Sequence, residues 1–210
     1  MPNYTLRNVK GSELTFTETD NNFIAGRTAG QLESCFVIGP QTGVYINQSF
    51  NGQDMTNVSA TVNNIRLTPF YVGWDTTIDQ VGVWQTSAGS QNLRTLIYSS
   101  DSNGLPSTLL SESSTLATSG SGGYLASVSF TFTANTRYWI GTHSDGTQTF
   151  RGLSDLNLKP LGVGTGLNTS AVCDHLTSSS YTFGSPPATW SFNTNQLGTG
   201  GVISVGLRIA

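Results

Sequence analysis

The feature that most constrains the fold is a repeated pattern of short apolar strands and turns, running from about residue 56 to the last residue. Val128, Phe130 and Phe132 alternate with serine and threonine, which is typical of a strand with one buried face. Further strands are expected over 44–46, 65–67, 70–72, 78–84, 93–98, 137–141 and 201–209. Because no helical pattern separates these segments, we predict an all-β fold, an antiparallel, jelly-roll-like β-sandwich.

Two tryptophans lie within the expected strands. Residues 78–84 alternate with a period of two, which predicts one buried face and one partly covered face. Ile78 and Trp84 fall on the same face of this pattern, and Trp139 lies in the strand over 137–141. Large aromatic rings in strands belong to the core by default, so we expect Trp84 and Trp139 to be buried.

The composition supports the all-β prediction. Charged residues make up 10% of the 210 residues, against about 25% in an average soluble domain. Their place is taken by serine, threonine, asparagine, glutamine and 24 glycines, which suit turns and the outer faces of sheets better than exposed helices. Hydrophobic residues make up 36%, enough to form a core.

The charge and the termini exclude several classes of partner. The net charge is −3 and the nine lysines and arginines are scattered, whereas nucleic-acid binding needs them clustered. No apolar run approaches the roughly 20 residues of a membrane span. The start, Met1-Pro2-Asn3-Tyr4, lacks the charged and apolar regions of a signal peptide. We therefore expect a protein that is made and kept in a cytoplasm, or that leaves it by lysis.

The N-terminal residues differ from the rest of the chain. Thr15 and Glu18 fit a capping box, which predicts a helical turn over 16–25 that Gly26 ends. A piece this short does not fold alone in water, so it must dock on its own chain or on a partner. Glycine-rich sequence follows to about residue 55. We expect residues 1–50 to form a leader and linker, and residues 51–210 to form the sandwich.

No set of residues predicts a catalytic or metal site. Cys173-Asp174-His175 places three reactive side chains in a row, but neighbours on a strand point to opposite faces, and His143 is the only other histidine. Residues 101–104 resemble the opening of a calcium loop, yet Leu105 and Pro106 follow where a ligand and a glycine are required. A plain turn is favoured, and we expect no catalytic residue, no metal and no cofactor.

The cysteines and the acidic residues leave alternatives open. Cys35 and Cys173 either pair or remain free buried thiols, and free thiols are favoured because two distant cysteines make no disulfide framework. Asp145, Asp155 and Asp174 lie in expected loops and would have to converge on one cleft to cleave a glycan. A small glycan hydrolase is therefore the least favoured hypothesis.

Aromatic residues supply the candidate ligand site. Tyr181, Phe183 and Trp190 lie in a turn-rich segment around Pro186 and Pro187. Exposed rings offer apolar faces for sugars, and neighbouring polar side chains can bind hydroxyls. The alternative is that these rings close the sandwich or pack in a subunit interface.

Residues 6–23, LRNVKGSELTFTETDNNF, resemble a leader found on many phage tail-fibre and other virion appendage proteins. That leader combines a Lys-Gly-Ser turn, Leu-Thr, an acidic residue and Asp-x-Asn-Phe. The resemblance implies attachment to the particle. The residues expected to carry it are Leu6, Arg7, Val9, Lys10, Gly11, Leu14, Phe16 and Phe23.

A second resemblance covers about 65–155. The chain resembles a β-sandwich module of phage fibre proteins in these strings: Leu67-Thr68-Pro69-Phe70, Ile97-Tyr98, Gly104-Leu105-Pro106, Leu109-Leu110 and Tyr138-Trp139. The two resemblances together imply a homotrimeric structural protein of a phage virion, without enzymatic activity. The first expectation is a tail-fibre or receptor-binding protein for a host surface glycan, and the second is a capsid decoration or head-fibre protein.

Overall fold

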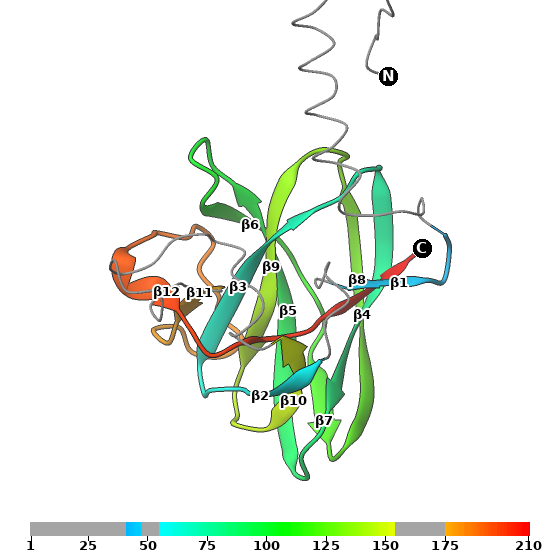
Figure 1. Cartoon of the computed structure of the whole chain (residues 1–210), viewed down its shortest axis with the longest axis vertical. Helices are drawn as coiled ribbons and strands as arrows, with labels where there is room; N and C mark the ends of the chain where they lie inside the picture. The colour runs from blue at the N-terminus through cyan, green and yellow to red at the C-terminus, as the bar shows by residue number, and fades with distance from the viewer. Residues whose placement is uncertain (1–40, 48–54, 154–174) are drawn as a thin grey trace, which may run out of the picture.

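The computed structural model describes residues 41–47, 55–153 and 175–210, which form two antiparallel β-sheets packed face to face (Figure 1). The predicted all-β antiparallel sandwich is confirmed. The expected helical turn and the proposed attachment residues lie outside the described residues, as do Cys35, Cys173, Asp155 and Asp174.

The first sheet, called sheet A, contains seven strands. They are β1 (Tyr45–Asn47), β2 (Thr56–Ser59), β4 (Thr76–Gln85), β8 (Gly122–Phe132), β10 (Thr149–Leu153), β13 (Val202–Ile203) and β14 (Gly206–Ile209). Their order is β1-β14-β4-β10-β13, with β8 also paired to β4 and β2 to β10. The expected strand over 201–209 thus forms two shorter strands, β13 and β14.

The second sheet, called sheet B, also contains seven strands. They are β3 (Asn64–Tyr71), β5 (Ser90–Ser100), β6 (Pro106–Glu112), β7 (Leu116–Ser119), β9 (Arg137–Ser144), β11 (His175–Ser178) and β12 (Leu197–Gly198). Their order is β12-β11-β3-β9-β5-β6, with β7 paired to β5, and a 3-10 turn over Thr194–Gln196 precedes β12. The two segments expected over 65–67 and 70–72 join in one strand, β3, which continues through Pro69.

The main core lies between the two sheets. Its largest rings are Phe70, Phe132 and Tyr138, with ring centroids of Phe132 5.2 Å from Phe70 and 5.0 Å from Tyr138. On β8, Val128 and Phe132 are buried while the alternating serine and threonine side chains are exposed, as predicted. The two-residue period of β8 therefore supplies one wall of this core.

The expected burial of Trp84 is wrong. Where β4 pairs with β14, Ile78 and Gln80 lie opposite two consecutive residues, so Asp79 is the extra residue of a β-bulge. A bulge shifts the alternation of faces by one residue. Ile78 therefore lies in the core with Val81, and Trp84 lies on the outer face with 55% of its surface exposed.

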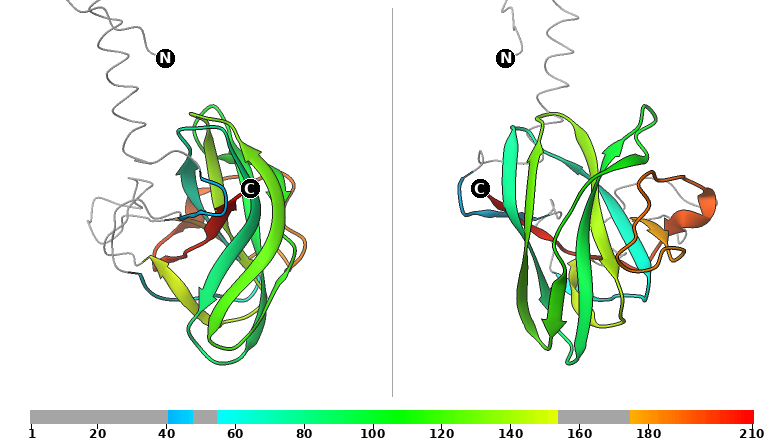
Figure 2. Two further views of the ribbon diagram at one scale, coloured as in Figure 1. Left: turned by 90° about the vertical axis from the view of Figure 1, so that its right-hand side faces the viewer. Right: turned by 180° about the vertical axis from the view of Figure 1, so that it is seen from behind.

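The sandwich extends N-terminal of the boundary expected near residue 50. Tyr45–Asn47, in the range assigned to the linker, form β1 and pair antiparallel with β14. Seen from behind, β1 lies on the opposite side of the molecule from the 3-10 turn and β12 (Figure 2). In the part of the chain that the structure describes, no helix is long and apolar enough to cross a membrane.

Candidate functional site

Residues 179–196, called the cover segment, lie over the outer face of sheet B. The hydroxyl of Tyr98 on β5 donates to the carbonyl of Pro187 at 2.9 Å. The amide of Trp190 donates to the carbonyl of Ser107 at 2.7 Å, and the amide of Leu109 donates to the carbonyl of Ala188 at 2.9 Å. These hydrogen bonds fasten the cover segment to β5 and β6.

Beneath the cover segment lies a second apolar cluster, with Trp190 at its centre. Trp190 is 5% exposed, and its ring meets that of Tyr98 edge-on with the centroids 5.8 Å apart. Its indole nitrogen donates to Oε1 of Gln196 at 3.1 Å. The rest of the cluster is Ile65, Leu67, Leu96, Trp139 and Leu176, with Leu109, Tyr181 and Leu197 packed against it. Trp139 is a core residue, as predicted.

These contacts correct the premise that Trp190 offers an exposed ring. Burial of Trp190 in the second cluster leaves no free face for a sugar. Tyr181 and Phe183 are half-buried: the Tyr181 ring lies 6.3 Å from that of Trp190, and the Phe183 ring lies 5.4 Å from that of His143. Trp190 therefore has a packing role, which was the alternative to ligand binding.

His143 lies fully buried on β9 under the cover segment. Its Nε2 is 3.0 Å from the carbonyl oxygen of Tyr181, and in the described part of the chain its Nδ1 has no hydrogen-bond partner. Burial lowers the pKa of His143 below its usual range, and the charge of Arg94 acts in the same direction. The Tyr181 carbonyl and Glu112 oppose these effects. A neutral His143 with its proton on Nε2 fits these surroundings.

Asp145 and His175 are the other reactive candidates that the structure describes. The carboxylate of Asp145 accepts from the backbone amide and the side-chain amide of Asn92 at 2.6 and 2.7 Å. His175 is buried in β11, and its neighbours Cys173 and Asp174 lie outside the described residues. Across 41–47, 55–153 and 175–210, no three histidine, cysteine or acidic side chains gather as metal ligands.

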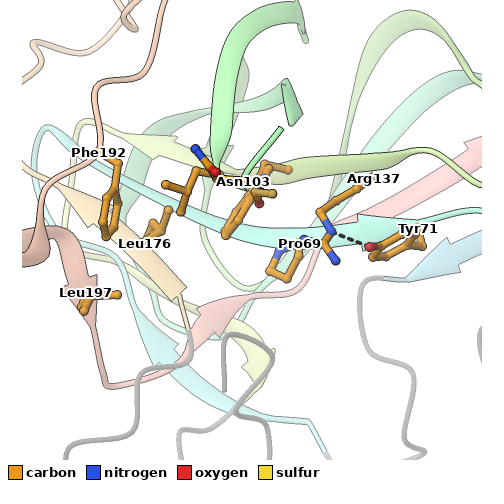
Figure 3. A pocket seen from close by; sticks show the side chains of 10 residues that line it. Pro69, Tyr71, Asn103, Arg137, Leu176, Phe192 and Leu197 are labelled. Atoms are coloured by element: carbon orange, nitrogen blue, oxygen red, sulfur yellow. Dashed lines mark hydrogen bonds between the residues drawn. The ribbon is translucent and has the colours of Figure 1, made fainter. Parts of the chain in front are cut away.

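Where the cover segment ends, a groove of about 480 Å³ opens on the outer face of sheet B (Figure 3). Phe192 and Leu197 lie at one end, and Arg137 and Tyr71 lie at the other. Among the described residues, the lining consists of Pro69, Tyr71, Asn103, Gly104, Leu105, Arg137, Trp139, Leu176, Phe192 and Leu197. The groove is thus bounded by β3, β9, the β5–β6 turn and the chain on either side of the 3-10 turn.

The β5–β6 turn forms one wall of the groove and is held by Asp101. One carboxylate oxygen of Asp101 accepts from the amides of Asn103 and Leu105, each at 2.8 Å, so these residues form the expected turn. Gly104 has a φ of +82°, a conformation that favours glycine. Its carbonyl accepts from the indole nitrogen of Trp139 at 3.1 Å, which ties the turn to β9.

Arg137 marks the polar end of the groove. Its Nε donates to the hydroxyl of Tyr71, and its guanidinium carbon lies 5.0 Å from the centre of the Tyr71 ring. A Cβ at position 104 would lie 2.1 Å from Nη1 of Arg137, so a larger residue there would displace the guanidinium. The turn and Tyr71 together hold the guanidinium in place.

Three residues of the groove were not predicted as site residues from the sequence: Tyr71, Arg137 and Phe192. The strings that resemble a phage fibre module supply Pro69, Gly104, Leu105 and Trp139 to the groove lining. These strings therefore indicated part of the groove's position in the sequence. No signal in the sequence indicated that β3 and β9 would meet residues near the 3-10 turn.

A second exposed feature lies on the outer face of sheet A. Tyr45, Trp84 and Leu125, called the exposed apolar face, are 40, 55 and 57% exposed. Glycines lie under these side chains: a Cβ at Gly123 would lie 3.3 Å from the Trp84 ring, and one at Gly82 would lie 2.9 Å from Leu125. Because the strand surface beneath has no side chains of its own, the three apolar groups lie directly on the sheet.

Comparison with models of known protein families gives no match, and no curated protein matches the chain.

Proposed function

We propose that this protein is a structural protein of a phage virion that binds a saccharide of the host surface, as a tail-fibre or receptor-binding protein. The observation that carries the proposal is the groove on sheet B. Its volume of about 480 Å³ falls within the range of about 300–1,000 Å³ that is usual for small-ligand sites. Its lining is largely apolar, with a few polar groups at defined positions.

The groove has the chemistry that a sugar requires. Phe192 is 37% exposed, so its ring can cover the apolar face of a sugar ring. The side chains of Asn103 and Arg137 can bind hydroxyl or charged groups beside it. Because the turn and the cover segment are fastened by hydrogen bonds, little ordering is needed when a ligand binds.

We propose binding without cleavage. Glycan hydrolysis uses two carboxyl groups on either side of the scissile bond. None of the described residues that line the groove is an aspartate or a glutamate. Release of reducing ends from host envelope material, lost on replacing Asp145, Asp155 or Asp174, would contradict this part of the proposal.

We further propose that residues 1–40 attach the protein to the particle and that the chain forms a homotrimer. The exposed apolar face supports this, because large exposed apolar patches often mark protein interfaces. Within the same face, Arg208 and Asp79 neutralise each other through two hydrogen bonds of 2.8 and 2.5 Å. A second copy can therefore approach without repulsion between like charges. Weak saccharide contacts, repeated in three subunits, would gain by avidity.

The groove is tested by adsorption of protein to host cells. Phe192→Ala should reduce binding strongly, because it removes the exposed ring of the groove. Leu110→Ala is the matched control, since Leu110 is 44% exposed and does not line the groove. Equal binding by both variants and the parent would contradict the proposed site.

The position of the protein on the virion is tested by imaging virions with antibody against residues 56–210. Label at the tail is expected, whereas label over the head would make capsid decoration the correct function. Deletion of residues 1–25 should abolish incorporation into particles and leave the sandwich folded.

The oligomer is tested by light scattering at micromolar concentration. The parent should have the mass of three chains, and Leu125→Asp should lower it, while Leu110→Asp should not. A monomer mass for the parent would contradict the trimer.

A further inference from the structure

We infer that the saccharide bound in the groove is acidic and that its carboxylate binds Arg137. This inference rests on the proposed function, because it names the chemical class of the ligand for the same groove. The chain has a net charge of −3, yet among the described residues that line the groove the only formally charged side chain is an arginine.

Arg137 differs from Arg94 and Arg208 in having no acidic partner among the described residues. Arg94 pairs with Glu112 at 3.1 Å, and Arg208 pairs with Asp79 at 2.5 Å. Among the residues that the structure describes, Arg137 has no carboxylate neighbour, and neither of its Nη nitrogens has an acceptor. A cation without a counter-ion at the end of an apolar groove favours an anionic ligand.

The position of the guanidinium is fixed before any ligand binds. Its Nε donates to the hydroxyl of Tyr71, and its guanidinium carbon makes a cation–π contact with the Tyr71 ring. This contact and the hydrogen bond hold the side chain without using its Nη nitrogens. Those nitrogens remain for a carboxylate, which the planar fork of arginine binds with two parallel hydrogen bonds.

The remainder of the lining suits the rest of an acidic sugar. Phe192 and Leu197 form apolar surface at the other end of the groove, where a sugar ring can pack, and Pro69 lies nearer Arg137. Asn103 lies between the two ends and can bind a hydroxyl. A uronic acid combines a carboxylate, hydroxyls and an apolar ring face in one residue, so it matches this arrangement.

The test uses surface polysaccharide purified from the host strain, in its native form and with its carboxyl groups reduced to alcohols. Calorimetry with the full chain should show binding of the native form and binding about 10- to 100-fold weaker for the reduced form, as expected for loss of hydrogen bonds to a charged group. A dephosphorylated sample should bind as the native form does. Loss of binding on dephosphorylation would identify a phosphate as the ligand group and overturn the inference.

Variants of Arg137 test whether this side chain binds the carboxylate, by changing the protein in place of the ligand. Arg137→Gln should weaken binding of the native polysaccharide about 10- to 100-fold and bring it to the level of the reduced form. Arg137→Lys should retain part of the affinity, because it keeps the charge but loses the fork. Arg151→Gln is the matched control, since Arg151 is exposed on β10 of sheet A and does not line the groove.

These measurements distinguish an error in the ligand class from an error in the proposed function. If native and reduced polysaccharide bind equally, and Arg137→Gln binds like the parent while Phe192→Ala does not, the groove binds a neutral sugar and only the present inference is wrong. If no polysaccharide binds, or Phe192→Ala has no effect, the proposed function itself is wrong. Unchanged thermal unfolding of each variant confirms that the comparison concerns folded protein.

Discussion

The outer faces of the two sheets carry similar kinds of side chain but have different surroundings. On sheet B, apolar groups such as Leu67, Leu96 and Trp139 are buried because the cover segment lies over them. On sheet A, Trp84 and Leu125 remain exposed. Outward-facing apolar residues therefore form a second core where a distant segment covers the sheet. Where no described segment covers the sheet, they form an exposed surface.

The two faces also differ in what lies directly beneath their apolar side chains. Under the cover segment, side chains from β3, β5 and β9 interlock with Trp190, so the face has its own packing. On sheet A, Gly82 and Gly123 lie beneath Leu125 and Trp84, so these groups rest on backbone. We expect substitutions on the first face to affect stability and those on the second to affect association.

Trp190→Ala should have the largest effect. Removing a buried tryptophan costs about 3–5 kcal/mol of unfolding free energy, through lost burial and the cavity that remains. Trp84→Ala, the same change on the exposed apolar face, should cost no more than about 0.5 kcal/mol. Urea unfolding in dilute solution measures both. Similar losses for the two variants would remove the distinction between the faces.

Tyr98→Phe should have an intermediate effect. It removes the donor to the Pro187 carbonyl and leaves that carbonyl without its partner, which costs about 1–2 kcal/mol. Burial raises the pKa of the Tyr98 hydroxyl, so the group is a neutral donor over the usual pH range. Tyr45→Phe on the exposed apolar face is the control and should unfold like the parent. A stable Tyr98→Phe variant would show that this hydrogen bond does not hold the cover segment.

Acidification should weaken the covered face gradually. The pKa of His143 is lowered in the folded state by burial, so the unfolded chain, with a histidine pKa of about 6.5, takes up the proton first. The contribution of His143 to stability is thus present above about pH 6.5 and is lost as the pH falls below it. His143→Gln should flatten the curve of unfolding free energy between pH 7.5 and 5.5. An unchanged curve would mean that other groups determine the pH dependence.

Leu125→Ala should have the smallest effect on stability. Leu125 is 57% exposed, so its truncation should change the unfolding free energy of dilute protein by less than about 0.5 kcal/mol. Leu96→Ala, at a fully buried position of sheet B, should cost about 2–5 kcal/mol. A large loss for Leu125→Ala would show that the exposed apolar face is packed within the subunit.

The strands were predictable because their information is local. The alternation of Val128 and Phe132 with polar residues is enough to define β8 and its buried face. The bulge at Asp79 was not predictable, because it depends on the register with β14, more than a hundred residues later in the chain. For the same reason, burial of Trp190 and the position of Arg137 beside Tyr71 could not be derived, since both depend on contacts between distant segments.

The pairing of β1 with β14 has a consequence for the order of events during synthesis. Tyr45 lies opposite Arg208, and Ile78 lies opposite Ile209, so neither β1 nor this edge of β4 can be paired until residues 206–209 have left the ribosome. Such distant pairing makes folding slow. In the described chain β1 pairs with β14 alone, so the strand that follows residues 1–40 docks late. The segment proposed to join the particle therefore becomes anchored to the sandwich only after β14 has been translated.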